Sequence, residues 1–86
     1  MPVWFRARNI KIGLLGYRGE KGHRPHVHVW IGNSQAPAAH AKVELDSLVV
    51  TNIWGFNGPQ ISAICKFVAS MNEALKGIWN AKVENS

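Results

Sequence analysis

The segment His23–Trp30 reads HRPHVHVW, and its second half decides how the chain is expected to fold. From position 26 onward, large polar or aromatic residues alternate with valine, which is the pattern of a half-buried β-strand. Because residues two apart on a strand share a face, His26, His28 and Trp30 are expected to point one way and the valines the other. The valine side suits the core. The sequence therefore predicts two imidazoles and an indole displayed together on the opposite side of a sheet.

Other strands are expected on both sides of this segment, followed by one long helix. Apolar and β-branched runs predict strands at about residues 10–17, 26–31, 41–45 and 48–53, with a flexible connection over residues 32–40. Pro59 suits the first position of a helix because its missing N–H has no partner there. Apolar residues then recur at helical spacing and form one stripe: Ile61, Ile64, Cys65, Val68, Met71, Leu75, Ile78 and Trp79.

The expected architecture is one α+β domain over residues 1–86. It consists of a four-stranded, mainly antiparallel sheet that a long C-terminal helix, over about residues 59–80, covers on one face. Trp54 and Phe56 are expected to pack the corner between the last strand and the helix, and Trp79 to cover the end of the core. The histidine-bearing face would then be left open, unless a second copy of the chain packs there.

Composition narrows the class of protein. Of the 86 residues, 47% are hydrophobic and 17% are charged, which suits a compact globule rather than a disordered chain. A single cysteine, Cys65, rules out an intrachain disulfide and fits a reducing cytoplasm. The first residues contain no long apolar run, so neither a signal peptide nor a membrane span is expected. We therefore expect a cytoplasmic protein without a membrane partner.

The positive charge is concentrated in the first third of the chain. Residues 1–30 contain six lysines and arginines but one acidic residue, whereas residues 31–86 contain four of each sign. The whole net charge of +5 therefore lies beside the histidines. Such a concentration favours a polyanionic partner such as nucleic acid, or an acidic protein. A solvated basic surface without any partner is the alternative reading.

The combination of histidines, basic residues and an aromatic residue is suited to ribonuclease chemistry. A metal-free ribonuclease needs an acid and a base that work near neutral pH, and histidine is the side chain suited to both roles. The candidates are His26 and His28, with His23 close by in the sequence. Trp30 could stack on a base, and cations could contact the phosphates. The candidate phosphate-binding residues are Arg6, Arg8, Arg18, Lys21 and Arg24.

Two other readings remain open at this point. His26 and His28 could bind zinc with His23 or His40 as a third ligand, but no cysteine pair or nearby carboxylate supports this, and no cofactor is indicated. The same surface could instead bind without catalysis. In that case basic and aromatic residues would hold nucleic acid, or tryptophan and arginine would anchor a partner protein or a second copy.

Several motifs resemble those of a known family. The opening Met1-Pro2 with Arg6, the pattern His23-x-Pro25-His26-x-His28-Val29, Phe67, and the spacing Leu75-x-x-x-Trp79 are similar to the bacterial domain of unknown function 4160. The resemblance covers roughly residues 1–80. Genes of that family often lie beside a second small gene, in an arrangement similar to toxin–antitoxin modules. The resemblance thus implies a small partner protein and an RNA-directed activity.

Together these features predict a small, basic, cytoplasmic component of a toxin–antitoxin-like module that binds or acts on nucleic acid, with RNA favoured over DNA. The alternative is a non-catalytic interaction or regulatory module that uses its exposed sheet face.

Overall fold

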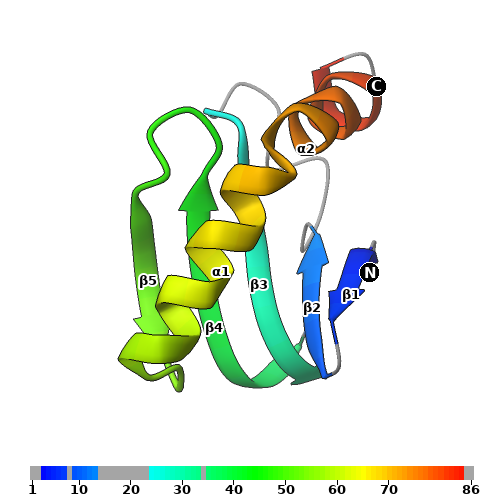
Figure 1. Cartoon of the computed structure of the whole chain (residues 1–86). Helices are drawn as coiled ribbons and strands as arrows, with labels where there is room; N and C mark the ends of the chain where they lie inside the picture. The colour runs from blue at the N-terminus through cyan, green and yellow to red at the C-terminus, as the bar shows by residue number, and fades with distance from the viewer. Residues whose placement is uncertain (1–2, 8, 14–23, 34, 85–86) are drawn as a thin grey trace.

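The residues that the structure describes form a sheet of five strands in sequence order, each antiparallel to its neighbours (Figure 1). The computed structural model describes residues 3–7, 9–13, 24–33 and 35–84. The strands are β1 (Val3–Ala7), β2 (Ile10–Gly13), β3 (His26–Asn33), β4 (Ala36–Glu44) and β5 (Val50–Trp54). They are followed by the helices α1 (Gly58–Ser70) and α2 (Asn72–Trp79) and a π-helical turn, η1 (Asn80–Glu84).

The expected four-stranded sheet under one long helix is therefore wrong. The additional strand is β1, which pairs with β2 at the edge of the sheet. The strand also contacts a distant part of the chain: the Phe5 ring packs edge-on against Phe67 of α1, with 6.2 Å between the ring centroids. A five-residue strand with arginine in its sequence carries too weak a local pattern to indicate this pairing.

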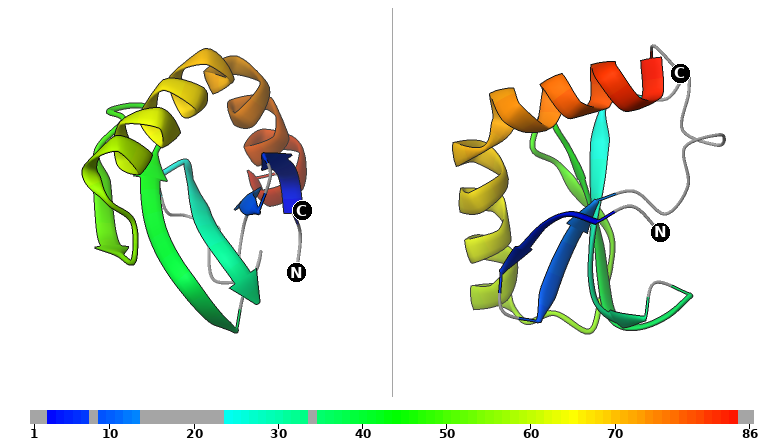
Figure 2. Two further views of the ribbon diagram at one scale, coloured as in Figure 1. Left: turned by 60° about the horizontal axis from the view of Figure 1, so that its bottom comes forward. Right: turned by 90° about the vertical axis from the view of Figure 1, so that its right-hand side faces the viewer.

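The predicted helix over residues 59–80 is divided at Met71, whose φ of −103° and ψ of 14° leave the helical region. The side chain of Asn72 donates a hydrogen bond of 2.6 Å to the carbonyl of Leu45, just after β4. This bond ties the start of α2 to the sheet. As a result α1 lies along one face, while α2 turns away and crosses the end of the sheet (Figure 2). The apolar stripe runs through the break with unchanged spacing, so periodicity could not reveal it.

α1 begins at Gly58, one residue before the start expected from Pro59. Asn57 caps the helix by accepting a 2.9 Å hydrogen bond from the Gln60 backbone, and the Gln60 side chain accepts one from the Asn57 backbone. This reciprocal arrangement is a capping box, which satisfies two backbone donors at the helix start.

The expected flexible connection over residues 32–40 is largely strand. β3 and β4 form a hairpin that closes where Asn33 pairs with Ala36, and the Asn33 side chain accepts a 2.9 Å hydrogen bond from the Gln35 backbone. The Ala36-Pro37-Ala38-Ala39 sequence has low β propensity and masked the strand. Pro37 is tolerated because β5 pairs with β4 only from His40 onward, so the strand has a free edge at that point.

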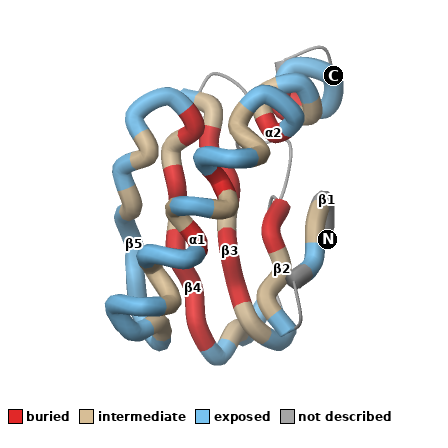
Figure 3. The backbone as a smooth tube through the Cα atoms, viewed as in Figure 1, coloured by how far each residue is buried: buried red, intermediate tan, exposed pale blue. Residues whose placement is uncertain are grey.

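The two faces of the sheet differ as the alternation predicted. Val27 and Val29 are fully buried on the face that α1 covers, together with Ile12, Val43, Ile64 and Val68. Trp79 is also buried and joins this core from α2, as expected. Burial is greatest along β3 and β4, and β5 is mostly exposed (Figure 3). Within the described ranges, no helix has the length and apolar content that crossing a bilayer requires.

Candidate nucleic-acid interface

The sheet surface opposite α1 brings together most of the chemically active side chains that the structure describes. Residues that are register partners on neighbouring strands point to the same face. The register joins Arg6 to Lys11, Lys11 to Trp30, Trp30 to His40, and His40 to Trp54. We call this surface the histidine face; it carries Arg6, Lys11, His26, His28, Trp30, His40, Lys42, Glu44, Thr51 and Trp54.

Two histidines on this face are hydrogen-bonded to each other. Nδ1 of His28 lies 3.0 Å from Nε2 of His40, and Nδ1 of His40 lies 2.9 Å from the carbonyl oxygen of Asn52. A carbonyl can only accept, so Nδ1 of His40 carries a proton and donates it. In the neutral ring Nε2 of His40 then accepts the N–H of His28 Nδ1. The chain of bonds therefore runs from His28 through His40 to the Asn52 carbonyl.

A bulge in β5 creates the anchor for this chain. Between His40 and Lys42 on β4 the register advances by two residues, whereas β5 advances by three from Trp54 to Thr51. The extra residue is accommodated where Asn52 adopts a φ of 53°, a left-handed conformation that asparagine tolerates better than most residues. Bulges of this kind redirect groups beside functional sites. Here the bulge turns the Asn52 carbonyl toward His40.

Trp54 extends the row of rings to the edge of the sheet. Its indole stacks on the His40 imidazole at 6.1 Å between centroids and 27° between planes, yet it remains 48% exposed. The expectation that Trp54 packs the strand-to-helix corner is therefore wrong. The next residue explains the difference, because Gly55 has a φ of 80° and turns the chain toward α1 only after the indole has been placed on the histidine face.

His26 is held differently from its neighbours. It is 1% exposed, its Nδ1 donates a 2.7 Å hydrogen bond to the Arg24 carbonyl, and its ring packs 4.9 Å from Trp79 of α2. The prediction that His26 and His28 share a face is confirmed, and their ring centroids lie 5.1 Å apart. The prediction that His26 is displayed there is wrong, because α2 crosses the end of the sheet and covers it.

Trp30 is likewise 1% exposed, although it points to the histidine face. An indole buried to this degree offers no open surface to a base, so the stacking role predicted for Trp30 does not fit this structure. Trp54 has the exposure that this role requires. The sequence could not show that Trp54, rather than Trp30, has the exposed indole. The exposure of Trp54 depends on β5 being an edge strand.

The candidate phosphate-binding residues are only partly described. Arg24 has an 84% exposed side chain, and its Nη1 lies 3.9 Å from Oε2 of Glu44. Arg6 is exposed on β1, and Lys11 donates a 2.9 Å hydrogen bond to the Gly32 carbonyl. Lys42, which no sequence pattern indicated as a candidate, is half-buried and pairs with His28 in the register of β3 and β4. The candidates His23, Arg8, Arg18 and Lys21 lie outside the described residues.

The described part of the chain gives no support to zinc binding. No three His, Cys, Asp or Glu side chains within it gather closely enough to hold a metal ion. His28 and His40 turn nitrogens toward each other at 3.0 Å instead of toward a common ligand. Their arrangement suits proton transfer and hydrogen bonding more than metal binding.

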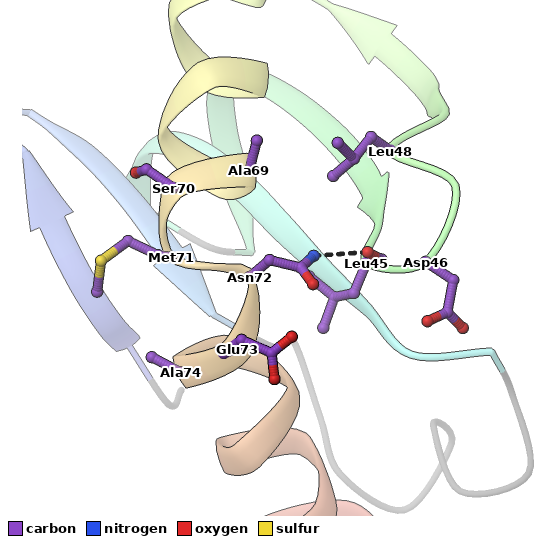
Figure 4. A pocket seen from close by; sticks show the side chains of 9 residues that line it. All are labelled: Leu45, Asp46, Leu48, Ala69, Ser70, Met71, Asn72, Glu73 and Ala74. Carbon is purple, nitrogen blue, oxygen red and sulfur yellow. Dashed lines mark hydrogen bonds between the residues drawn. The ribbon is translucent and has the colours of Figure 1, made fainter.

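A separate hollow of about 600 Å³ lies at the elbow between α1 and α2, away from the histidine face (Figure 4). Its wall is formed by the helix break and by the segment that joins β4 to β5, and Asn72 reaches across it to the Leu45 carbonyl. Asp46 at its rim pairs with Lys76 at 3.0 Å. The hollow gathers no basic or aromatic side chains of the kind that bind nucleic acid.

No protein-family model, curated protein or solved structure matches this chain.

Proposed function

We propose that this chain is a small cytoplasmic RNA-binding protein that holds single-stranded RNA on its histidine face, as part of a toxin–antitoxin-like module. The observation that carries the proposal is the stack of Trp54 on His40. It leaves about half of the indole open next to a basic sheet surface. The module assignment rests on the resemblance to the domain of unknown function 4160.

An exposed indole supported from behind is a favourable platform for a nucleotide base. Base–aromatic stacking contributes about 1–3 kcal/mol per base, and every base can take part because each has a π-face. His40 fills the inner side of the indole and restricts its motion, so less conformational entropy is lost when a base stacks on the outer side. Hydrogen bonds to His28 and Asn52 hold His40 in turn.

Cations on the same surface can contact the backbone of the RNA. Arg6, Lys11 and Lys42 occupy this face on three different strands, and Arg24 is exposed just before β3. Sequence-independent RNA binding combines a positively charged track with stacking, and these residues supply the track. Single strands are favoured over duplexes because stacking on Trp54 needs an unpaired base.

Substitution of Trp54 tests the proposal. We expect Trp54→Ala to weaken binding of a fluorescein-labelled single-stranded RNA by roughly 5- to 150-fold in an anisotropy titration, the equivalent of about 1–3 kcal/mol. Trp54→Phe should retain part of the affinity. Val49→Ala is the matched control, since it removes another exposed apolar side chain next to β5. Equal affinity of wild type and Trp54→Ala, with both folded by circular dichroism, would contradict the proposal.

A second candidate function is the docking of a partner protein. The observation in its favour is that Val49, Ile53 and Trp54 are all exposed along the β5 edge. Protein interfaces are enriched in exposed aromatic residues, which anchor the contact. In that case Val49→Ala and Ile53→Ala would weaken capture of the partner, whereas RNA affinity would be negligible for every variant.

A further inference from the structure

We propose that two copies of this chain associate through the outer edge of β5, so that their sheets join side by side. Among the described strands, β5 is the last of the sheet, and it pairs with β4 alone (Figure 1). A strand in this position has backbone N–H and C=O groups that face away from the sheet and can pair with another strand. The association goes beyond RNA binding and does not depend on it.

The side chains of β5 are open to solvent. Val50 is half-buried, and every residue from Thr51 to Trp54 is exposed (Figure 3). The large apolar side chains that are exposed in the described part of the chain are Val49, Ile53 and Trp54, and all of them lie in β5 or directly before it. Exposed apolar side chains that gather in one place mark an interaction surface on many soluble proteins.

β5 lacks the charged residues and prolines by which proteins usually protect an edge strand. Neither kind of residue occurs in β5, and residues 47–65 contain no lysine, arginine, aspartate or glutamate. Edge strands that stay unpaired commonly carry such residues, lysine above all. The opposite edge of the described sheet is β1, which has the exposed Arg6 within it and is protected in this way.

The length of β5 limits the strength of the association. The strand has five residues, and the bulge at Asn52, where φ is 53°, interrupts its regular geometry. Bulges hinder the pairing of edge strands. We therefore expect the contact to bury less than the total of about 1,200 Å² at which stable interfaces begin. The dimer should accordingly be weak and reversible, with a dissociation constant in the micromolar range or above.

A second copy of the chain is the partner that fits this edge. The net charge is +5, so two copies repel each other wherever their basic surfaces meet. At β5 they can approach without bringing like charges together, because residues 47–65 are uncharged. A charged partner would find no complementary group there. Two identical edge strands can pair antiparallel about a two-fold axis, so that each strand meets its own copy.

Pairing at this edge leaves the histidine face open. Trp54 is the register partner of His40 and stacks on its ring, so the indole points out of the plane of the sheet and not along it. Antiparallel pairing about a two-fold axis perpendicular to the sheet places both histidine faces on the same side. The two sheets then form one continuous surface that carries both Trp54 indoles.

Sedimentation equilibrium of the wild-type protein, freed of nucleic acid, tests the association. The protein should change from monomer to dimer as its concentration rises through the micromolar range. Added salt should strengthen the dimer, because it screens the repulsion between the two positive chains and favours apolar contact. RNA binding responds to salt in the opposite direction, which separates the two properties. A monomer at every concentration, or a dimer that salt weakens, would overturn the proposal.

Ile53→Lys tests the position of the interface. The substitution places the same charge on both edge strands, and like charges on facing strands oppose pairing, so the dissociation constant should rise by at least about 10-fold. Ala81→Lys is the matched control, since it adds the same charge at an exposed position of η1. At high salt, where distant charges are screened, the control should dimerise like the wild type. Equal weakening by both substitutions, with both variants folded by circular dichroism, would place the contact elsewhere.

Ile53→Asp provides a complementary partner for Ile53→Lys. Each variant alone brings like charges together, whereas a mixture of the two brings opposite charges together. The mixture should therefore associate at least about 10-fold more tightly than either variant alone. A mixture that associates no more tightly than its components would show that the β5 edges do not meet.

Hydrogen exchange of the wild-type protein gives a result even if these variants do not fold. Exchange of the β5 amides should slow as the protein concentration rises, because pairing protects them, while exchange of the β1 amides should stay the same. Unchanged exchange in β5, or slowing confined to β1, would contradict the proposal.

Discussion

Gly55 shows how a single residue positions the candidate site. It has a φ of 80°, and a Cβ atom placed on it would lie 2.6 Å from the Ala38 carbonyl oxygen and 2.7 Å from Cα of Ala39. Both obstacles are backbone atoms of β4, which cannot rotate away. Glycine is therefore required where the chain leaves β5, directly after Trp54.

We expect Gly55→Ala to lower the free energy of unfolding by more than about 2 kcal/mol, because strain and overlap add. Chemical denaturation followed by circular dichroism measures the change. Gly77→Ala is the matched control, since a Cβ there meets nothing within 4 Å and the residue lies inside α2. That substitution should stabilise the protein by about 0.5–1 kcal/mol. Similar destabilisation by both substitutions would contradict this account of Gly55.

At the residue scale, part of the site could be predicted from the sequence. The alternation from His26 to Ile31 correctly divided the core face from the histidine face. It could not show that His40 would meet His28, because that contact depends on the register of β3 against β4. Nor could it show that α2 would bury His26, or that an edge strand would expose Trp54.

At the scale of elements, the elbow between α1 and α2 shapes the molecule. A straight helix would follow one face of the sheet and leave its end open. The turn at Met71 instead carries Trp79 over the end of β3, where it packs against His26. The polar residues Ser70 and Asn72 flank the turn. The apolar stripe continues through it without interruption, so the sequence pattern did not predict the turn.

We expect Asn72→Ala to destabilise the protein by about 1 kcal/mol, because it removes the donor to the Leu45 carbonyl and leaves that group partly buried. The midpoint of urea denaturation measures this effect. Glu73→Gln, at the neighbouring exposed position, should change stability by less than about 0.5 kcal/mol. An unchanged midpoint for Asn72→Ala would show that the elbow does not depend on this bond.

At the scale of the whole molecule, the covering helix and the positively charged side chains lie on opposite faces of the sheet. Helix α1 and the core occupy one face of the sheet, and the cations of β1, β2 and β4 lie on the other. The concentration of charge in the first third of the sequence anticipated a basic surface. It did not indicate Lys42, which comes from the nearly neutral remainder of the chain and reaches the same face through strand pairing.

We expect the RNA affinity to fall steeply with salt, because each phosphate contact releases counterions. Removing one contact should reduce the slope of log K against log salt by about 0.7 for a single strand. Lys42→Ala should show this reduction. Lys66→Ala, which removes an exposed lysine from α1, should leave the slope unchanged. Equal slopes for the two variants would place the RNA away from the histidine face.

The central claim is that RNA lies on the histidine face, and an NMR titration of the isotope-labelled protein with single-stranded RNA tests it most directly. The account predicts that the indole N–H of Trp54, the rings of His28 and His40 and the amides around Lys42 shift together, while the amides of α1 stay in place. Shifts confined to α1 or to the hollow at the elbow, or no shifts at all, would contradict it.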